Sequence, residues 1–209
     1  MNLDLIKEKY FVPKNVLDIG ANVGQFYILC KNTFPKADIL SIEGNILCAK
    51  PLSLINPNYL IKLLDAEPRI RKFFLNKNNL LSTGSSIYKE LSEHFNFENS
   101  KCVNVKTTNL DKLLPYQVFD LVKIDTQGSE LDILIGGEKL LKRTKGVIIE
   151  VSHKPYNLNA PLSYKVVNFM LEQNFLLKET LDSNKSLHQS DFFFVNEWWY
   201  EYYAKIIQE

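Results

Sequence analysis

The sequence predicts an α/β domain in which helices cover both faces of a mostly parallel sheet. Short apolar runs without helical periodicity alternate along the chain with segments of helical character, and glycine or proline stands at many of the joints. Strands that alternate with helices imply crossover connections, which make neighbouring strands parallel. The length of 209 residues and the 45% of hydrophobic residues suit one well-buried domain, residues 1–209.

The first half of the chain contains three expected strands separated by two helices. The first apolar run lies between Pro13 and Gly20 and is typical of a strand buried on both faces. Pro35 ends the helix that follows, and Pro51 stops the second, short helix. The expected elements are a strand at 15–20, a helix at 25–33, a strand at 38–43, a short helix at 46–50 and a strand at 59–64.

The second half resumes the alternation after an irregular region. Residues 71–75 and 102–105 mix apolar and polar side chains, which indicates partly exposed antiparallel or edge strands around the loop LLSTGSS. The expected elements then continue with a strand at 118–125, an amphipathic helix at 129–141, a strand at 147–151, a helix at 162–173, and strands at 175–180 and 192–195.

Charge, cysteine content and the N-terminal residues exclude several classes of protein. The 25 basic and 24 acidic residues leave a formal net charge of +1, so no nucleic-acid partner is expected. Cys30, Cys48 and Cys102 show no C-x-x-C spacing, so we expect buried thiols in a reducing compartment. The first ten residues lack the pattern of a signal peptide, and no apolar run approaches the roughly 18 residues of a membrane span. A cytoplasmic protein without a membrane span is therefore expected.

The stretch VLDIGANVGQF, residues 16–26, places a glycine turn directly after the first strand and before the first helix. Such a turn lets a ligand approach the backbone and the amides at the helix start, as in nucleotide-type cofactor sites. Asn22 stands where the dinucleotide fingerprint needs a glycine, which argues against a nicotinamide-dependent oxidoreductase. The structural alternative is that Gly20 and Gly24 only permit a tight turn and close helix packing.

Two carboxylates accompany this turn. Asp18 lies at the end of the first strand, where a negative charge suits a cationic ligand better than a pyrophosphate. Glu43 ends the second strand, where a carboxylate can accept hydrogen bonds from both ribose hydroxyls. This order of acid, glycine turn and second acid predicts an S-adenosylmethionine pocket formed by Asp18, Gly20, Ala21, Asn22, Gly24 and Glu43.

Two stretches, VLDIGANVGQF and DLVKIDTQGSELDILIGGEKLL followed by VIIEVS, resemble the FkbM-type methyltransferase family. The similarity runs from about Asn15 to Val195, so the core is expected at 15–195. The resemblance implies S-adenosylmethionine-dependent methylation, mostly of hydroxyls on sugars and natural products. It also implies a Rossmann-like, seven-stranded sheet of the class I methyltransferase type with one antiparallel strand.

The resemblance extends to particular residues. It implies that Leu63 to Asp65 border the adenine, with Leu63 and Asp65 among the cofactor contacts. The family usually has an acid where Gln127 stands, whereas Asp125, Gly128 and Glu130 keep its pattern. We assign Glu130 to the first turn of the following helix, where its charge suits the helix dipole.

Ligands of open parallel sheets bind beyond the carboxyl ends of the strands, which places Asp125, Glu150 and His153 near the expected cofactor. Asp125 is the first candidate for orienting or deprotonating a hydroxyl acceptor; alternatively, it caps the helix that starts near Gly128. His153 is a weaker candidate for the base, because a lone histidine on a loop is more often solvated or structural. The three could gather a metal ion, but no spacing requires one, so no metal is expected.

Two further segments have open interpretations. Ser85, Ser86 and Tyr88 follow a glycine in a loop that either forms part of the acceptor wall or lid, or is a plain surface turn. The C-terminal residues predict an amphipathic helix at 197–207. Its aromatic face packs on its own domain, forms a homodimer interface or, least favoured because of Glu197 and Glu201, lies on a membrane surface. The face consists of Trp198, Trp199, Tyr202, Tyr203 and Ile206.

The leading interpretation is thus an S-adenosylmethionine-dependent O-methyltransferase whose partner is a small-molecule hydroxyl acceptor such as a saccharide. N-methylation remains open. The rival interpretation is a non-catalytic binding or scaffold protein that retains the fold and uses the aromatic C-terminal helix as its partner surface. The feature that supports this rival interpretation is Gln127, which stands where the family usually has an acid.

Overall fold

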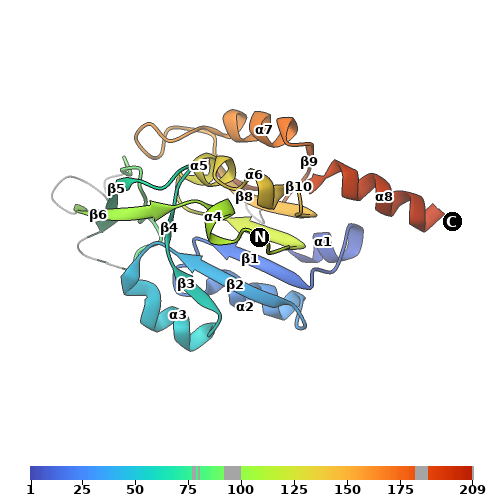
Figure 1. Ribbon diagram of the computed structural model, residues 1–209, viewed down its shortest axis with the longest axis horizontal. Coiled ribbons are helices and arrows are strands. Elements are labelled where there is room, and N and C mark those ends of the chain that lie inside the picture. The colour runs from blue at the N-terminus through green and yellow to red at the C-terminus, as the bar shows by residue number, and fades with distance from the viewer. Residues whose placement is uncertain (77–78, 80, 92–99, 182–187, 209) are drawn as a thin grey trace.

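A computed structural model describes residues 1–76, 79, 81–91, 100–181 and 188–208, with the side chains of 203–208 excepted (Figure 1). A 3-10 turn at Ile46–Cys48 precedes α3. The elements are α1 Asp4–Lys9, β1 Asn15–Ile19, α2 Gln25–Thr33, β2 Asp38–Glu43, α3 Ala49–Ile55, β3 Tyr59–Ile61, β4 Leu63–Leu64, β5 Ile70–Asn76, β6 Ser100–Thr108, α4 Leu110–Leu113, β7 Leu121–Ile124, α5 Glu130–Ile135, α6 Glu138–Leu141, β8 Gly146–Ser152, α7 Ser163–Glu172, β9 Phe175–Thr180, β10 Gln189–Asn196 and α8 Glu197–Gln208.

The main sheet has seven strands in the order β3-β2-β1-β7-β8-β10-β9. The pairs from β3 to β8 are parallel, and β10 runs antiparallel to both β8 and β9. The alternating strands and helices, the seven-stranded sheet and its one antiparallel strand are all confirmed. The strand order reverses beside β1, which is where ligands of such sheets bind.

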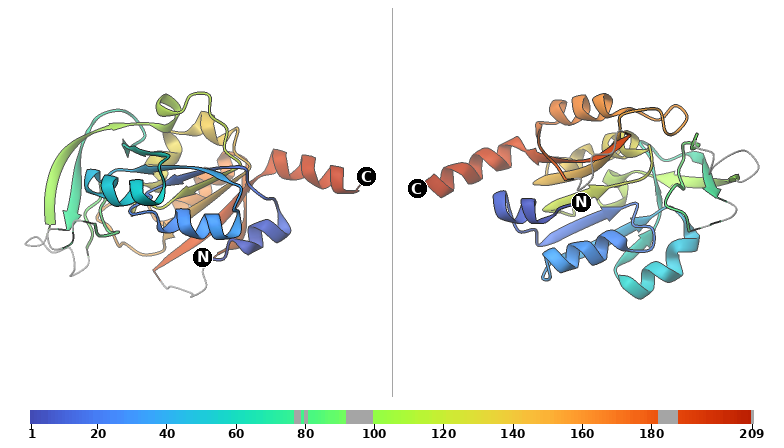
Figure 2. Two further views of the ribbon diagram at one scale, coloured as in Figure 1. Left: turned by 90° about the horizontal axis from the view of Figure 1, so that it is seen from below. Right: turned by 180° about the vertical axis from the view of Figure 1, so that it is seen from behind.

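Alternation along the strands builds a separate apolar core on each face of the sheet. Leu17 and Ile19 of β1 face one core, which is completed by α5, α6 and α7. Val16 faces the other core, which is completed by α1 and α2. Figure 2 shows these two layers of helices on opposite sides of the sheet. Polar residues of even number in β1, and of odd number in β2 and β7, therefore share the α2 face.

A second, three-stranded sheet of order β4-β6-β5 stands at the end of the molecule opposite α8 (Figure 1). Residues 71–75 and 102–105, expected as antiparallel or edge strands, lie within the longer strands β5 and β6, which pair with each other in antiparallel orientation. The single strand expected at 59–64 is wrong. The backbone N–H of Lys62 donates a hydrogen bond to the carbonyl oxygen of Glu43 in β2. The next two residues, Leu63–Leu64, pair with Thr107–Thr108 of β6 instead. Cys102 on β6 is exposed, so only Cys30 and Cys48 are buried as expected.

Two of the expected helices have different bounds. Pro51 does not stop its helix but occupies the first turn of α3, where a missing amide costs no helical bond. The helix expected at 129–141 is broken into α5 and α6 at Gly136–Gly137. A Cβ at Gly136 would lie 2.5 Å from the carbonyl oxygen of Asp65 and 2.8 Å from Cβ of Asn109, so the loop after β4 and the start of α4 press against this break.

Several boundaries follow tertiary contacts that local patterns do not show. The strand expected at 118–125 is shorter, Leu121–Ile124. Helices α1 and α4 were not expected at all, because short helices depend on tertiary packing more than on their own periodicity. Ile6 of α1 and Leu110 of α4 are each buried in one of the two cores.

The C-terminal helix α8 extends away from the body of the domain (Figure 1). Only part of its aromatic face packs back: Trp199 does so as expected, together with Tyr200, which lies outside the expected face. Trp199 contacts Phe11 with ring centroids 5.0 Å apart, and Tyr200 lies 6.2 Å from Tyr10. Trp198 and Tyr202 are 79% and 67% exposed. Tyr203 and Ile206 lie outside the described side chains. No described helix has the length and hydropathy of a membrane span.

Candidate active site at the carboxyl ends of the strands

A cavity of about 530 Å³ opens beyond the carboxyl ends of β1, β2, β7 and β8. Its wall includes the predicted residues Asp18, Gly20, Ala21, Asn22, Glu43, Leu63, Asp125 and Glu150. Gly24 does not line the cavity but stands at the start of α2 with φ +97°. The volume lies in the range of small-molecule sites, roughly 300–1,000 Å³.

The glycine turn is a tight left-handed connection between β1 and α2. Gly20 has φ +84° and Asn22 has φ +49°, a region that glycine and asparagine tolerate best. A Cβ at Gly20 would overlap the carbonyl oxygen of Asp125, so this glycine allows the loops after β1 and β7 to touch. A Cβ at Gly24 would lie 2.8 Å from Cγ2 of Ile55, which explains the second glycine by close packing against α3.

Glu43 is a buried carboxylate at the end of β2 that organises the turn. One oxygen accepts the N–H of Asn22 at 2.8 Å, and the other accepts the N–H of Asn45 at 2.7 Å. Burial raises the pKa of Glu43, and these backbone hydrogen bonds oppose the shift. Because each carboxylate oxygen has two lone pairs, Glu43 retains acceptor capacity toward the cavity.

Asp18 lies on the α2 face of β1, in register with Ser41 of β2 and Lys123 of β7. The Ser41 hydroxyl donates to its carboxylate at 3.3 Å. Burial raises the pKa of Asp18 to about 7, with a smaller rise from the charge of Asp125, while Lys123 opposes the shift. A ligand that brings positive charge to this end of the cavity would stabilise the ionised form of Asp18.

Lys123 is a site residue that the sequence analysis missed. It is buried at 2% exposure, and its ammonium contacts Asp125 at 2.9 Å and Asp191 at 3.6 Å. Burial alone lowers the pKa of a lysine, but here the charges of Asp125 and Asp191 outweigh burial and raise it. The sequence does contain a signal for it, because alternate residues of a strand share a face. A lysine two residues before Asp125 in an apolar strand is therefore expected to lie beside that aspartate.

Gln127 joins the two predicted acids at the other end of the cavity. Its amide nitrogen donates to Asp125 at 3.0 Å and to Glu150 at 2.6 Å. Gln189 donates to the same oxygen of Glu150 at 3.1 Å. The loop holds Gln127 in a left-handed conformation with φ +58°, followed by Gly128 at φ +110°.

The two acids differ in protonation. Burial would raise the pKa of Asp125, but the charge of Lys123 and the hydrogen bonds from Lys123 and Gln127 outweigh it and lower that pKa. Burial, followed by the charge of Asp125, raises the pKa of Glu150 to about 9. The two pKa shifts have opposite signs, which favours an ionised Asp125 beside a protonated Glu150, a separation of roles seen in acid–base sites.

Glu130, at the start of α5 as expected, takes the role that a capping Asp125 would have had. Its buried carboxylate accepts the N–H of Thr126 at 2.8 Å and the N–H of Gly128 at 2.9 Å. Burial raises the pKa of Glu130, and these bonds oppose the shift. The carboxylate of Asp125 instead accepts bonds from two side chains that line the cavity, which favours the functional interpretation over the cap.

The structure does not bring His153 or Asp65 to the cavity. The ring nitrogens of His153 pair with the hydroxyls of Ser163 at 3.2 Å and Ser190 at 3.0 Å. Asp65 is fully buried and binds Arg69 through two hydrogen bonds of 2.7 and 2.8 Å. Both positions carry structural bonds, so the geometry supports neither a base at His153 nor an adenine contact at Asp65.

The loop after β5 closes one side of the cavity. Ser85 and Ser86 line the wall, as the acceptor-wall interpretation expects, together with Ser82 and Thr83. Tyr88 instead donates to Asp132 at 2.8 Å and is not among the lining residues. Among the described residues, no group of three or more His, Cys, Asp or Glu side chains is arranged to hold a metal ion.

The comparisons with known proteins agree with this geometry, and the sheet is that of the class I methyltransferases. Residues 18–177 match the family described as Methyltransferase FkbM domain. The chain therefore belongs to the FkbM methyltransferase family. No curated protein sequence matches the chain significantly.

Solved structures with this fold are distant in sequence. Methyltransferase FkbM from Methylobacillus flagellatus KT aligns with a TM-score of 0.59 at 12% identity, over 87% of this chain and 43% of that chain. Magnesium protoporphyrin IX methyltransferase from Synechocystis PCC 6803, with bound SAM, gives 0.52 at 10% identity over 87% and 69%. A Methanococcus jannaschii fibrillarin pre-rRNA processing protein gives 0.53 at 14% identity over 89% and 67%. This chain thus spans less than half of the FkbM structure, and these likenesses establish the fold alone.

Proposed function

We propose that this chain is an S-adenosylmethionine-dependent O-methyltransferase that acts on a hydroxyl of a sugar or a natural-product-like small molecule. The observation that carries the proposal is one cavity with two chemically distinct ends. Asp18, the turn from Gly20 to Asn22 and Glu43 form one end; Asp125, Gln127 and Glu150 form the other. Membership of the FkbM family and the bound SAM of the Synechocystis structural neighbour support the same cofactor.

The donor set fits this cofactor. Glu43 offers carboxylate lone pairs to ribose hydroxyls, and Asp18 offers a negative charge to a cationic ligand. The apolar side chain of Leu63 supplies a surface for the adenine. When bound, the cofactor supplies an electrophilic methyl group on a sulfonium.

The opposite end of the cavity handles the acceptor. The ionised Asp125 accepts the hydrogen bond of the acceptor hydroxyl, orients its oxygen and takes its proton as the oxygen is methylated. Lys123 and Gln127 hold the carboxylate in place. Glu150 keeps its own proton and so does not compete with Asp125 for the proton of the acceptor.

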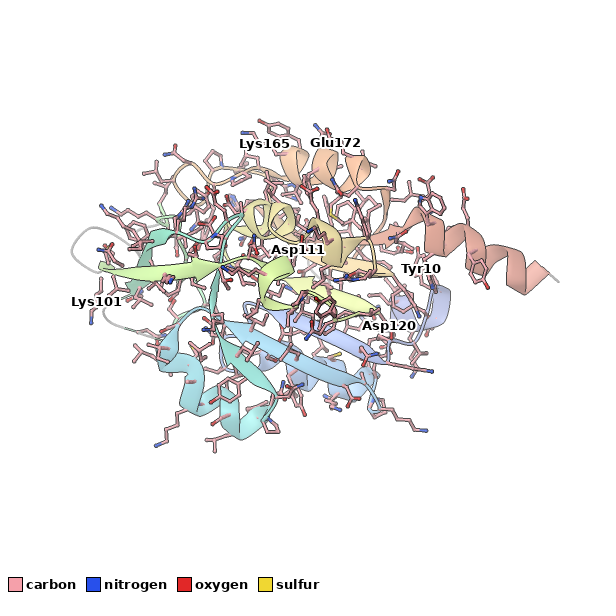
Figure 3. All side chains as sticks on the ribbon, in the orientation of Figure 1. Tyr10, Lys101, Asp111, Asp120, Lys165 and Glu172 are labelled. Atoms are coloured by element: carbon pink, nitrogen blue, oxygen red, sulfur yellow. The ribbon has the colours of Figure 1, made fainter. Side chains whose placement is uncertain are left out.

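Calorimetric titration with S-adenosylhomocysteine tests the cofactor assignment without requiring an acceptor. We expect binding by the wild type and loss of binding on Glu43→Ala, because the turn loses its carboxylate along with the ribose contacts. Glu172→Ala, on the outer side of α7 and remote from the cavity, is the matched control and should bind normally (Figure 3). A folded wild type that binds no S-adenosylhomocysteine would contradict the proposal and favour the non-catalytic scaffold.

A further inference from the structure

Residues 81–88, in the segment after β5, contribute several residues to the cavity wall: Ser82, Thr83, Ser85, Ser86 and Ile87. We call residues 81–88 the strap. Ile87 packs in one apolar cluster with Leu63, the proposed adenine contact. Ser82 lies instead beside Gln127 of the acceptor end, because the two residues also share the wall of a smaller hollow. The strap therefore reaches both ends of the cavity.

The end of the strap at Tyr88 is fixed by bonds to three other parts of the domain. The Tyr88 hydroxyl donates to Asp132 of α5 at 2.8 Å, and the Tyr88 carbonyl accepts the side-chain amide of Asn157 at 3.1 Å. Ser86 and Phe74 of β5 exchange two backbone hydrogen bonds of 2.8 and 3.2 Å. These anchors come from α5, β5 and the segment before α7, and not from the glycine turn.

The opposite end of the strap is bound by the glycine turn. The side-chain amide of Asn22 donates to the carbonyl oxygen of Leu81 at 3.2 Å and to that of Ser82 at 3.5 Å. Other hydrogen bonds at this end are local, such as that from the N–H of Ser82 to the carbonyl of Asn79 at 2.9 Å. Among the described residues, Asn22 is the one distant residue that is hydrogen-bonded to residues 81–85. One side chain thus joins this end of the strap to the body of the domain.

Asn22 also contacts the carboxylate proposed to bind the ribose. Its backbone N–H donates to Glu43 at 2.8 Å, and its Oδ1 accepts the N–H of Val23 at 2.9 Å. The second bond fixes the side-chain amide, so that its nitrogen is directed at the strap. Asn22 therefore connects Glu43 to the strap through a single residue whose backbone and side chain are both held.

A ligand in the cavity favours the attached state of the strap. Such a ligand contacts wall residues of the turn and of the strap together only when the two are joined, and it shifts an equilibrium by its differential affinity for the two states. The adenine of the proposed cofactor would gain contact with Ile87, and its ribose would hold Glu43 and hence the N–H of Asn22 in place. By linkage, attachment of the strap strengthens cofactor binding by the same factor. Ser82 is at the same time fixed beside Gln127.

We propose that Asn22 is a positioning residue that latches the strap to the glycine turn, so that cofactor binding and completion of the acceptor wall stabilise each other. Asn22 acts through residues 81–82 and is assigned no part in the transfer of the methyl group or the proton. The proposal rests on the proposed function for the identity of the ligand, but the latch itself is a property of the protein without ligand.

Hydrogen–deuterium exchange of peptides from residues 81–88 tests the latch, with and without S-adenosylhomocysteine. Without ligand, Asn22→Gly should speed exchange of the strap about two- to tenfold, the equivalent of one lost hydrogen bond. Glycine keeps the left-handed backbone but has no side-chain amide. Asn174→Gly, also left-handed at φ +61° and away from the described cavity wall, is the matched control and should leave strap exchange unchanged. Asn22→Asp is a second variant, because it keeps an acceptor for the N–H of Val23 but lacks the donor.

Saturating S-adenosylhomocysteine should slow exchange of the strap in the wild type and slow it less in Asn22→Gly. A purely structural role for Asn22 would lower the free energy of unfolding without a selective increase in strap exchange. Equal strap exchange in the wild type and both Asn22 variants, or bound ligand that leaves wild-type strap exchange unchanged, would overturn the latch. Failure of S-adenosylhomocysteine to bind the wild type in calorimetry contradicts the proposed function instead, and the comparison without ligand then still decides whether Asn22 latches the strap.

Discussion

The two ends of the cavity hold their carboxylates in different ways. At the cofactor end, Glu43 is bound by the backbone amides of Asn22 and Asn45. At the acceptor end, Asp125 and Glu150 are bound by the side chains of Lys123, Gln127 and Gln189. Backbone amides are present whatever side chains the loop carries, whereas each side-chain partner is lost or changed by a single substitution. The cofactor end is therefore a property of the local fold, and the acceptor end is a property of individual residues.

Asp125→Asn should have the largest effect, because it removes the proposed base but keeps the shape of the site. We expect the rate of methyl transfer to fall about 10²- to 10⁴-fold, the usual contribution of general-base catalysis, with unchanged affinity for S-adenosylhomocysteine. Turnover and calorimetry on the same preparation measure both. Asp38→Asn, at the exposed start of β2, is the control. Full activity of Asp125→Asn would remove the base from the mechanism.

Lys123→Met should be the most destabilising of the four substitutions, since it leaves Asp125 and Asp191 without their buried cation. The side chains of Asp125 and Asp191 keep 36% and 17% exposure, so water solvates part of the charge left behind. We therefore expect a loss of about 1–3 kcal/mol in the free energy of unfolding measured in urea. Lys145→Met is the control. Its ammonium also contacts a carboxylate, Asp120, at 2.8 Å, but it is partly exposed and lies at the opposite end of the sheet (Figure 3). That pair should contribute at most about 1 kcal/mol. Equal losses of unfolding free energy in the two variants would contradict the larger contribution assigned to the buried lysine.

The affinity for S-adenosylmethionine should depend on pH through Asp18. The carboxylate is protonated below its raised pKa of about 7, and a cationic ligand favours the ionised form. Affinity should therefore fall as the pH drops below 7, by about tenfold per unit for a binding mode that requires the ionised form. Calorimetry between pH 5.5 and 8 follows it, with Asp18→Asn as the comparison. The same slope in Asp18→Asn would assign the pH dependence to another group.

His153→Ala should have the smallest effect on the reaction. Its ring binds Ser163 and Ser190 outside the cavity, so we expect a stability loss of about 1 kcal/mol and an unchanged rate of methyl transfer. Thermal unfolding and turnover check the two parts. A tenfold loss of rate with normal stability would return His153 to the list of catalytic candidates.

Local patterns predicted the order of the elements well, because strands and helices have different periods and glycine or proline separates them. They failed where tertiary contacts decide. Nothing in the local sequence YLIKLL predicts that the chain turns away from β2 at Leu63 and pairs with β6. Likewise, helical periodicity does not predict that Gly136 packs against the loop after β4. The residues packed from α8 also depend on where Phe11 and Tyr10 lie.

The same difference applies to the site. Asp18, the glycine turn and Glu43 could be found from their spacing along one βαβ unit. Lys123 could have been found from its alternation with Asp125, but Gln189 and Tyr156 come from distant segments that only the folded chain brings to Gln127 and its neighbours. Asp65 and His153 show the converse. Each lies near the expected strand end and has a suitable side chain, but that side chain does not reach the cavity. Asp65 binds Arg69 instead, and His153 binds Ser163 and Ser190.

The contact between Gly20 and the carbonyl of Asp125 sets a rule for engineering this domain. Any side chain larger than hydrogen at position 20 would push the two loops apart. A chimera with a foreign acceptor loop must therefore keep glycine at position 20. The foreign loop must also follow the same backbone path at position 125. The side chain of Thr126 also lies against Gly20, and the carbonyl of Ser82 accepts from Asn22. Exchanges should therefore be confined to side chains from 127 onward or to the segment from 83 to 86. Libraries that aim at new acceptors should therefore be built outside it.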